Sequence, residues 1–213
     1  MTKLFRKDNE NFEKFVLSLL GNLKKNVTMS KFYVFFAPEF EEIEAVAPID
    51  ILRRAGAEVE IVSISDVRLV AGAHGIAVQT DTIISEVKVT DQDWMILPGG
   101  MPGATNLVNC PALACALKAH ADNGGQIAAI CASPAVVLAQ LGLLKGVNAT
   151  CYPGFEDGLM ASGANYVETG VVIDGNITTA SGPGYATDFG LAIVEQAFGE
   201  EVADQVASGM LLK

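Results

Sequence analysis

Short apolar runs alternate with longer amphipathic stretches through most of this sequence, and this alternation constrains the fold more than any other feature. Phe32–Ala37 and Trp94–Leu97 are continuous apolar runs, as expected of parallel strands that are buried on both faces. Between them, Glu42–Ala55 carries apolar residues near helical spacing and ends at Gly56. Strands separated by helices of about 10–15 residues predict a doubly wound α/β fold with a mostly parallel sheet.

The other predicted elements continue this pattern. Further strands are predicted at Val59–Ser63, Gln126–Ile130, Val171–Ile173 and Ile177–Ala180, with part of a hairpin or edge pair at Ile76–Thr80. Further helices are predicted at Pro111–Asn123, at Ser133–Leu141 and from Thr187 onward. Pro48 falls inside the first predicted helix, where we expect it to bend the helix.

Composition limits the function classes that remain open. The chain has 213 residues, of which 50% are hydrophobic and 18% charged, which indicates a globular protein with a substantial core. Its net charge of −11 argues against nucleic acid or an acidic membrane surface as a partner. No run of about 20 apolar residues is present, so no membrane span is predicted.

The cysteine and histidine counts give a second set of limits. The four cysteines form no CxxC pair and the sequence has two histidines, so we expect no metal site and specifically no zinc cage. Free thiols in a chain of this size suggest a reducing, cytoplasmic setting.

Residues 1–28 differ in composition from the rest of the chain. They are rich in lysine and arginine, and their apolar run, Phe15–Leu20, is too short for a secretory core. Asp8, Glu10 and Glu13 argue against an organelle transit peptide. We expect residues 1–28 to be a loosely attached extension, or to lie upstream of the true start at Met29. Residues 29–213 then form a single domain, and a functional role for the extension stays open.

Cys131 is the candidate nucleophile. It follows an apolar strand-like run and precedes a helix-like run, so its sulfur is expected at the end of the sheet, facing the positive end of the next helix. The neighbouring Ala129 and Ala132 are small enough for a sharp turn, while Ser133 is suited to cap the helix and Pro134 to begin it. The alternative is that Cys131 serves as a small buried hydrophobic residue.

Three unusual features follow three of the predicted strands. The acidic segment Glu39–Glu44, the pair Gly99 and Gly100, and Cys131 each come directly after one. Because the carboxyl ends of parallel strands lie at one edge of the sheet, these features are expected to meet there. Ligands bind at that edge in open α/β folds, so the sequence predicts a site.

Each of these features also has a simpler explanation. Glu41 and Glu42 are expected only to favour the positive start of the helix, whereas Glu44, beside apolar neighbours, is expected to point toward the sulfur. The two glycines either form a turn or allow a backbone amide to approach a reacting oxygen. His74, in the loop sequence GAHG, is equally suited to a site or to the surface.

Four segments together resemble one protein family. The segments AICASP, LPGG, EEIEAVAPIDILRRAG and SGPGYATDFGLAIVE are similar to those of the ThiJ/PfpI superfamily, in the branch of the parkinsonism-associated protein deglycase and its bacterial relatives. The resemblance runs from Ser30 to Leu212. It implies a flavodoxin-like three-layer α/β sandwich that forms homodimers, with Arg53 and Arg54 near the dimer contact.

The resemblance also implies roles for individual residues. Cys131 matches the nucleophile and Glu44 its carboxylic acid partner, while Gly100 and Ala132 match the positions whose amides bind an oxyanion. Gly99 and His74 join the candidate substrate-binding residues. Another candidate is Tyr152, which stands where many relatives have a histidine before a proline. A phenol donates hydrogen bonds but does not titrate near neutral pH, so any role of that histidine is not transferred.

Two enzymatic classes within the superfamily do not fit these residues. Protease-like members have a histidine directly after the cysteine, where this chain has Ala132, and glutaminases need a downstream His-x-Glu that this chain lacks. The leading hypothesis is a cofactor-independent glyoxalase or deglycase acting on small 2-oxoaldehydes or their adducts. In it, Cys131 attacks the aldehyde and Glu44 moves the proton. The alternative is a peroxide-responsive redox sensor or chaperone without significant turnover, with Cys151 as a possible second oxidisable thiol.

Overall fold

A seven-stranded, mostly parallel sheet forms the centre of the protein. The computed structural model describes residues 30–212, so the predicted extension lies outside the described residues. The strand order is β10-β11-β7-β6-β1-β2-β5, and the pairing is parallel throughout except between β10 and β11. The strands are β1 (Lys31–Phe36), β2 (Glu58–Ser63), β5 (Thr82–Ile83), β6 (Trp94–Leu97), β7 (Gln126–Ile130), β10 (Val171–Asp174) and β11 (Ile177–Ala180).

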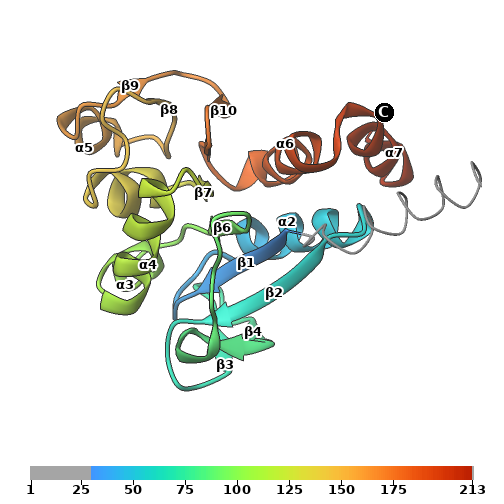
Figure 1. The fold of residues 1–213 in the computed structure, drawn as a ribbon, viewed down its shortest axis with the longest axis horizontal. Helices are drawn as coiled ribbons and strands as arrows, with labels where there is room; N and C mark the ends of the chain where they lie inside the picture. Colours follow the sequence, from blue (N-terminus) through green and yellow to red (C-terminus); the bar gives the residue numbers. More distant parts are fainter. Residues whose placement is uncertain (1–29, 213) are drawn as a thin grey trace, which may run out of the picture.

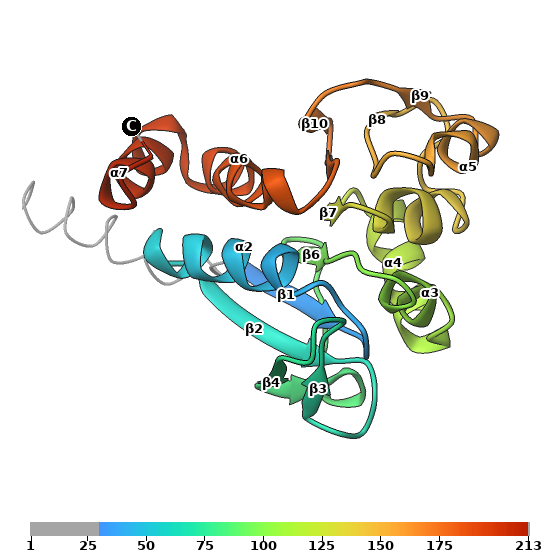
Figure 2. The same ribbon diagram turned by 180° about the vertical axis from the view of Figure 1, so that it is seen from behind.

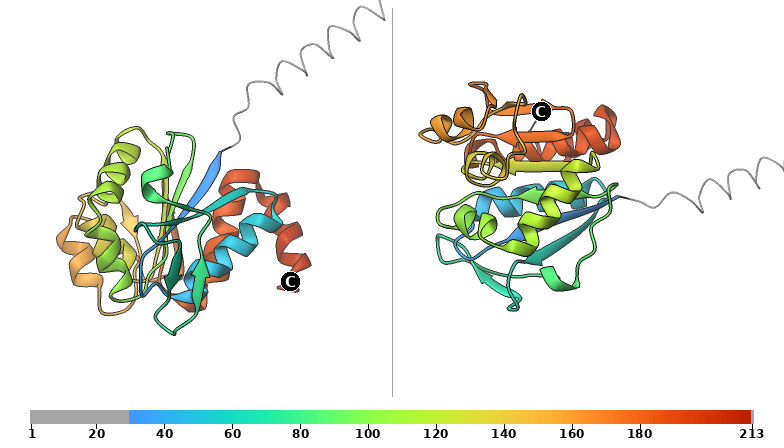
Figure 3. Two further views of the ribbon diagram at one scale, coloured as in Figure 1. Left: turned by 90° about the horizontal axis from the view of Figure 1, so that it is seen from below. Right: turned by 60° about the vertical axis from the view of Figure 1, so that its left-hand side comes forward.

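Helices cover both faces of this sheet, which confirms the predicted three-layer α/β sandwich (Figure 1). One face is covered by α2 (Glu42–Arg54), α6 (Ala186–Phe198) and α7 (Glu200–Gly209). The other carries α3 (Gly103–Val108), α4 (Pro111–Asp122) and the π-helical segment η2 (Pro134–Ala139), with α5 (Glu156–Ala161) packed against η2. The left view of Figure 3 shows the two helical layers on either side of the strands. Strands covered on both sides need apolar residues at every position, which explains their continuous apolar runs.

Two small sheets and two short 3₁₀ segments complete the structure. Strands β3 (Leu69–Ala71) and β4 (Ala77–Gln79) form an antiparallel hairpin, as expected near Ile76–Thr80. Figure 2 shows it beyond β2, at the margin of the domain. The sequence patterns did not reveal the remaining short pieces: the parallel pair β8 (Asn148–Ala149) and β9 (Asn165–Tyr166), with η1 (Ile84–Glu86) and η3 (Pro183–Tyr185).

The predicted cap of the helix after Cys131 was wrong. Ser133 already has helical backbone angles, φ −62° and ψ −35°, whereas a capping residue needs an extended conformation. Its buried hydroxyl instead donates a hydrogen bond of 2.6 Å to the carbonyl of Pro98. Ser133 therefore ties the turn after β7 to the loop after β6.

Two other helix predictions differ in detail. Pro48 lies inside α2 without ending it. The final helical region divides at Gly199, whose φ of +91° is in the left-handed region that glycine adopts easily. Among the described residues, no helix combines the length and apolar character needed to cross a bilayer.

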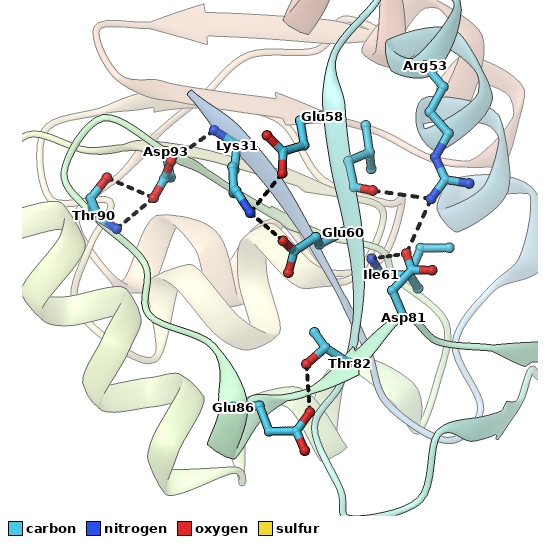
Figure 4. Close-up of polar contacts among 11 residues, drawn as sticks. Lys31, Arg53, Glu58, Glu60, Ile61, Asp81, Thr82, Glu86, Thr90 and Asp93 are labelled. Atoms are coloured by element: carbon cyan, nitrogen blue, oxygen red, sulfur yellow. Dashed lines mark hydrogen bonds and ion pairs between the residues drawn. The ribbon is translucent and has the colours of Figure 1, made fainter. Parts of the chain in front are cut away.

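Polar contacts at the start of β1 join this strand to β2 and to the segment that precedes β6 (Figure 4). The ammonium group of Lys31 lies 2.8 Å from Glu58 and 2.6 Å from Glu60. Asp93, which is buried, accepts hydrogen bonds from the Lys31 amide at 2.9 Å and from the amide and hydroxyl of Thr90 at 2.7 and 2.8 Å. One carboxylate thus fixes the start of β1 next to the start of β6.

We predict that Asp93→Ala destabilises the protein by about 2 kcal/mol, because it leaves three donors without their buried acceptor. Urea unfolding at neutral pH measures this effect. Asp91→Ala, an exposed change in the same loop, is the matched control and should change the free energy of unfolding by less than about 0.5 kcal/mol. Equal effects of the two variants would contradict this account of Asp93.

Candidate active site

Cys131 occupies the sharp turn that the sequence predicts between β7 and η2. Its φ is +65°, a left-handed conformation that is uncommon for any residue other than glycine. Two hydrogen bonds of 2.8 Å stabilise it: the Cys131 amide donates to the carbonyl of Ala180, and its carbonyl accepts from the amide of Tyr152. The backbone conformation that directs the sulfur is therefore fixed by two other segments of the chain.

The sulfur of Cys131 is nearly buried among polar groups. The residue is 8% exposed, and the backbone amides of Gly100 and Ala132 are close enough to the sulfur to favour its ionised form. The side chain of Glu44 also interacts with it. The sequence-predicted residues Cys131, Glu44, Gly100 and Ala132 thus come together at the carboxyl ends of the strands.

Glu44 is more deeply buried than the cysteine. It is 1% exposed, and its Oε2 accepts a hydrogen bond of 2.9 Å from the amide of Gly99. Its Oε1 is fully buried and makes no well-directed hydrogen bond within residues 30–212, although the Cys131 thiol is close enough to the carboxyl to interact with it. A buried oxygen without a donor favours a neutral carboxylic acid over a carboxylate.

The first turn of α2 places Glu44. Glu41 is the N-cap, and its carboxylate accepts a hydrogen bond of 2.8 Å from the Glu44 amide, as expected for an acidic residue at a helix start. The Glu41 amide in turn donates to the carbonyl of Gly99 at 3.0 Å. Gly99 therefore joins the loop after β6 to the start of α2 twice, through its carbonyl to the Glu41 amide and through its amide to the Glu44 carboxyl group.

Glycine is required at positions 99 and 100. A Cβ atom on Gly99 would lie 2.5 Å from Oε2 of Glu44 and 2.6 Å from Cβ of Cys131. Gly100 has a φ of +93°, and a Cβ atom there would lie 2.6 Å from the amide nitrogen of Glu41. Gly99 is thus needed for the close approach of the backbone to Glu44 and Cys131, and Gly100 for its turn conformation and its close approach to the segment before α2.

The electrostatics of the pair are dominated by burial. Burial raises the pKa of Glu44 to about 7, with a further increase from the charge of Glu41 and opposing effects of the hydrogen bonds to Cys131 and Gly99. Burial and an ionised Glu44 also raise the pKa of the Cys131 thiol, while the amides of Gly100 and Ala132 lower it. The sequence argument expected the turn and the positive helix end to favour a thiolate at Cys131. In the structure, burial and Glu44 oppose this effect, so the turn and the helix end do not by themselves produce a thiolate. The two groups titrate as a coupled pair.

The two remaining candidates take different positions. Tyr152 contacts Cys131 through its backbone, and its ring packs so closely on Gly182 that a Cβ there would lie 3.0 Å from it. His74 instead pairs with Glu42, with 2.7 Å between Nδ1 and Oε2. Glu42 was expected only to favour the helix start. Its bond to a residue 32 positions away had no signal in the local sequence.

Among the described residues, one group of side chains has the spacing of metal ligands, and it consists of Glu41, Glu42 and His74. One ligand atom from each lies within 4.8 Å of the others. Several of these atoms already make hydrogen bonds, since Glu41 caps α2 and both oxygens of Glu42 accept from the 74–76 segment. The positive start of α2 also disfavours a cation there.

The other cysteines have different environments. Cys151 is buried, and burial, followed by the charge of Glu156, raises the pKa of its thiol to about 12. This disfavours Cys151 as a second oxidisable thiol at neutral pH. Cys110 is half-buried, and Cys115 is exposed on α4.

Comparisons with known proteins agree with the fold and the motifs. Residues 30–196 match the DJ-1/PfpI family, which confirms the resemblance inferred from the four sequence segments. The chain is 43% identical over 173 residues to protein DJ-1 homolog A of Arabidopsis thaliana, covering 81% of this chain and 44% of that protein. It therefore spans less than half the length of that relative.

Two further relatives match over nearly their whole length. A Caenorhabditis elegans protein named glutathione-independent glyoxalase DJR-1.2 is 36% identical over 172 residues, covering 81% of this chain and 90% of the relative. The solved structure of oxidized Toxoplasma gondii DJ-1 superposes with a TM-score of 0.81 at 42% identity, covering 85% of this chain and 98% of that one.

We predict that Glu44→Gln removes a pH dependence of stability. Because the pKa of Glu44 is about 7 in the folded protein, against an ordinary value of 4.5, its stabilising contribution is complete below pH 4.5 and is lost as the pH rises through 7. This lowers the free energy of unfolding by about 3 kcal/mol. The free energy of unfolding of wild type should therefore fall relative to that of Glu44→Gln between pH 4.5 and pH 8.

Urea titrations at both pH values measure this difference. Glu168→Gln, an exposed substitution of the same type, controls for the change in net charge. Parallel pH dependences of wild type and Glu44→Gln would show that burial does not raise the pKa of Glu44.

Proposed function

The chain belongs to the DJ-1/PfpI family, and on this basis we propose that it is a cysteine-dependent stress protein that converts small 2-oxoaldehydes, or the adducts they form, into hydroxy acids. The observation that carries the proposal is the buried carboxyl group of Glu44 beside the sulfur of Cys131. The relative from C. elegans is named a glutathione-independent glyoxalase, which supports the same reaction class.

The proposal depends on where the pair keeps its remaining proton. With the first proton lost near pH 7, the pair carries one proton and one negative charge. Two amide donors, from Gly100 and Ala132, reach the sulfur, whereas Glu44 accepts from the single amide of Gly99. Oε1 of Glu44, which has no well-directed donor, is suited to carry the proton. Burial and an ionised Glu44 raise the pKa of the Cys131 thiol, but the two groups titrate together, and for the reactive form of the pair we assign the charge to sulfur and the proton to the carboxyl group.

The reaction balances without an external oxidant or reductant. The thiolate of Cys131 forms a bond to the aldehyde carbon, and the carbonyl oxygen takes the electron pair and then the proton of Glu44. Glu44, now ionised, next moves the proton on the former aldehyde carbon to the neighbouring carbonyl carbon, and the hydroxyl proton of the first carbon passes to the oxygen of the second. The second carbon is thereby reduced to an alcohol while the first is oxidised to a thioester. Water cleaves the thioester, giving the hydroxy acid and the free thiol. In this proposal the amides of Gly100 and Ala132, which are close to the sulfur, stabilise the negative oxygen.

The second candidate function is a redox sensor or chaperone without significant turnover. It is favoured by the same sulfur, whose amide donors would also stabilise the oxygens of an oxidised cysteine. The decisive measurement is peptide mass spectrometry after low peroxide, with the exposed Cys115 as internal comparison. Selective oxidation of Cys131 supports the sensor, and equal rates at Cys110, Cys115 and Cys151 exclude it.

A homodimer in the cytoplasm is the proposed form of the protein. Ile43 and Val46 on α2 are 56% and 46% exposed, and Ile76, 59% exposed, lies beside this helix because its amide donates to Glu42 at 3.4 Å. An exposed apolar surface of this kind is typical of a contact with another protein. The four free cysteines are consistent with the reducing cytoplasm.

We predict that Ile43→Glu converts a dimer into a monomer in light scattering coupled to size exclusion, because a charge replaces an apolar contact. Met160→Glu, an equally polar change on the exposed side of α5, should leave the mass of the assembly unchanged. A wild-type mass equal to that of one chain would refute the dimer.

We predict that Cys131→Ser and Glu44→Gln each reduce methylglyoxal consumption at least about a hundredfold, since one removes the nucleophile and the other the proton carrier. Product formation is measured as the hydroxy acid, at equal protein concentration. Cys115→Ser, a change at the exposed thiol, is the matched control and should retain full activity. Equal rates for wild type and Cys131→Ser would discard the mechanism.

A further inference from the structure

The strongest unexplained contact near the site joins Glu42 to the loop between β3 and β4. Oε1 of Glu42 accepts hydrogen bonds from the amides of His74 at 2.7 Å and Ile76 at 3.4 Å, while Oε2 lies 2.7 Å from Nδ1 of the His74 ring. Glu42 is 7% exposed, whereas the His74 side chain is 70% exposed. Burial raises the pKa of Glu42, but the hydrogen bonds from the ring and amide of His74 together lower it below its usual value. The carboxylate thus acts as a buried acceptor for an outer loop.

The segment between β1 and α2 lies between this loop and the site. On one side, the Glu39 amide donates to the carbonyl of Ala71 and the Ala73 amide to the carbonyl of Phe40, both at 2.9 Å. On the other side, the Glu41 amide donates to the carbonyl of Gly99. Glu39 has a φ of +66°, a conformation that a residue with a side chain maintains only with external support.

The hairpin loop is shaped to accept Glu42. A Cβ atom on Gly72 would lie 2.5 Å from Oε1 of Glu42, so glycine is needed where the carboxylate meets the loop. The sequence GAHG therefore supplies both the space and the partner for Glu42.

We propose that Glu42 and His74 are positioning residues for the Cys131–Glu44 pair. By joining the 72–76 loop to the first turn of α2, they fix the segment from which Glu44 reaches Gly99 and the sulfur. Neither residue touches the reacting atoms, so both act through the placement of Glu44. The effect on turnover rests on the proposed function, whereas the effect on the thiol does not.

Misplacement of a catalytic group by a fraction of an ångström reduces turnover strongly. Loss of the Glu42–His74 contact should therefore lower kcat while leaving KM nearly unchanged. It should also move the pH midpoint of Cys131 alkylation, because that midpoint reports the coupling of the thiol to Glu44.

The test uses the full chain with His74→Ala as the principal variant. Its side chain is exposed, so its removal leaves no cavity in the core. The rate of Cys131 alkylation by iodoacetamide is followed against pH by peptide mass spectrometry, and kcat and KM are measured with methylglyoxal. Arg68→Gln is the matched control, since it breaks the ion pair of 2.8 Å with Glu86 at the base of the same hairpin without touching α2.

We expect His74→Ala to lower kcat about tenfold and to shift the alkylation midpoint, with the melting temperature close to that of wild type. Arg68→Gln should change neither quantity. Glu42→Gln, which keeps the size of the side chain, should act in the same direction. If Glu42→Gln fails to fold, the result for His74→Ala alone decides whether the positioning role holds.

The outcomes separate the two proposals. An unchanged midpoint and an unchanged kcat in His74→Ala overturn the positioning role, and so does an equal change in Arg68→Gln. A shifted midpoint in a protein whose wild type does not consume methylglyoxal supports the positioning role and refutes the proposed function. If the wild type consumes methylglyoxal and His74→Ala changes neither kcat nor the alkylation midpoint, the proposed function is supported and the positioning role is refuted.

Discussion

The interaction on which the site depends is the burial of one carboxyl group against one sulfur atom. Glu44 is removed from water almost completely, and the loop after β6 supplies a single amide to one of its oxygens. The cost of ionising such a group raises its pKa to about 7, which makes it a proton donor at neutral pH. An exposed glutamate at the same distance would be ionised and would repel a thiolate. The chemistry of Cys131 is therefore a property of the pair and of its enclosure.

Three strand ends form this enclosure, and each contributes one element. The segment after β1 leads into α2 and Glu44, the loop after β6 provides Gly99 and Gly100, and the turn after β7 carries Cys131. Because neighbouring strands β1, β6 and β7 are parallel and adjacent in the sheet, these loops meet without any long connection. The fold thus determines which residues meet, and the glycines determine how closely.

Much of this could be predicted from the sequence, because the strongest signals were local. The apolar runs identified β1, β6 and β7, and the small residues around Cys131 indicated the sharp turn that its φ of +65° confirms. What could not be predicted depends on contacts between distant segments. Ser133 has the residue type of a cap, yet its hydroxyl bonds Pro98, and Glu42 bonds a loop 32 residues away. The very short strands β8 and β9 carry too few residues for any periodicity.

The two hydrogen bonds that fix the backbone of Cys131 have a consequence for synthesis on the ribosome. Their partners, Ala180 and Tyr152, are translated after the cysteine, and Ala180 is the last residue of β11. A nascent chain that has emerged only as far as α5 contains Cys131, Glu44 and Tyr152 but not Ala180, whose carbonyl accepts from the Cys131 amide. We therefore expect the Cys131 thiol to take its final orientation only when β11 pairs with β7. Before that step, the thiol of an unfinished chain should react like that of an ordinary cysteine.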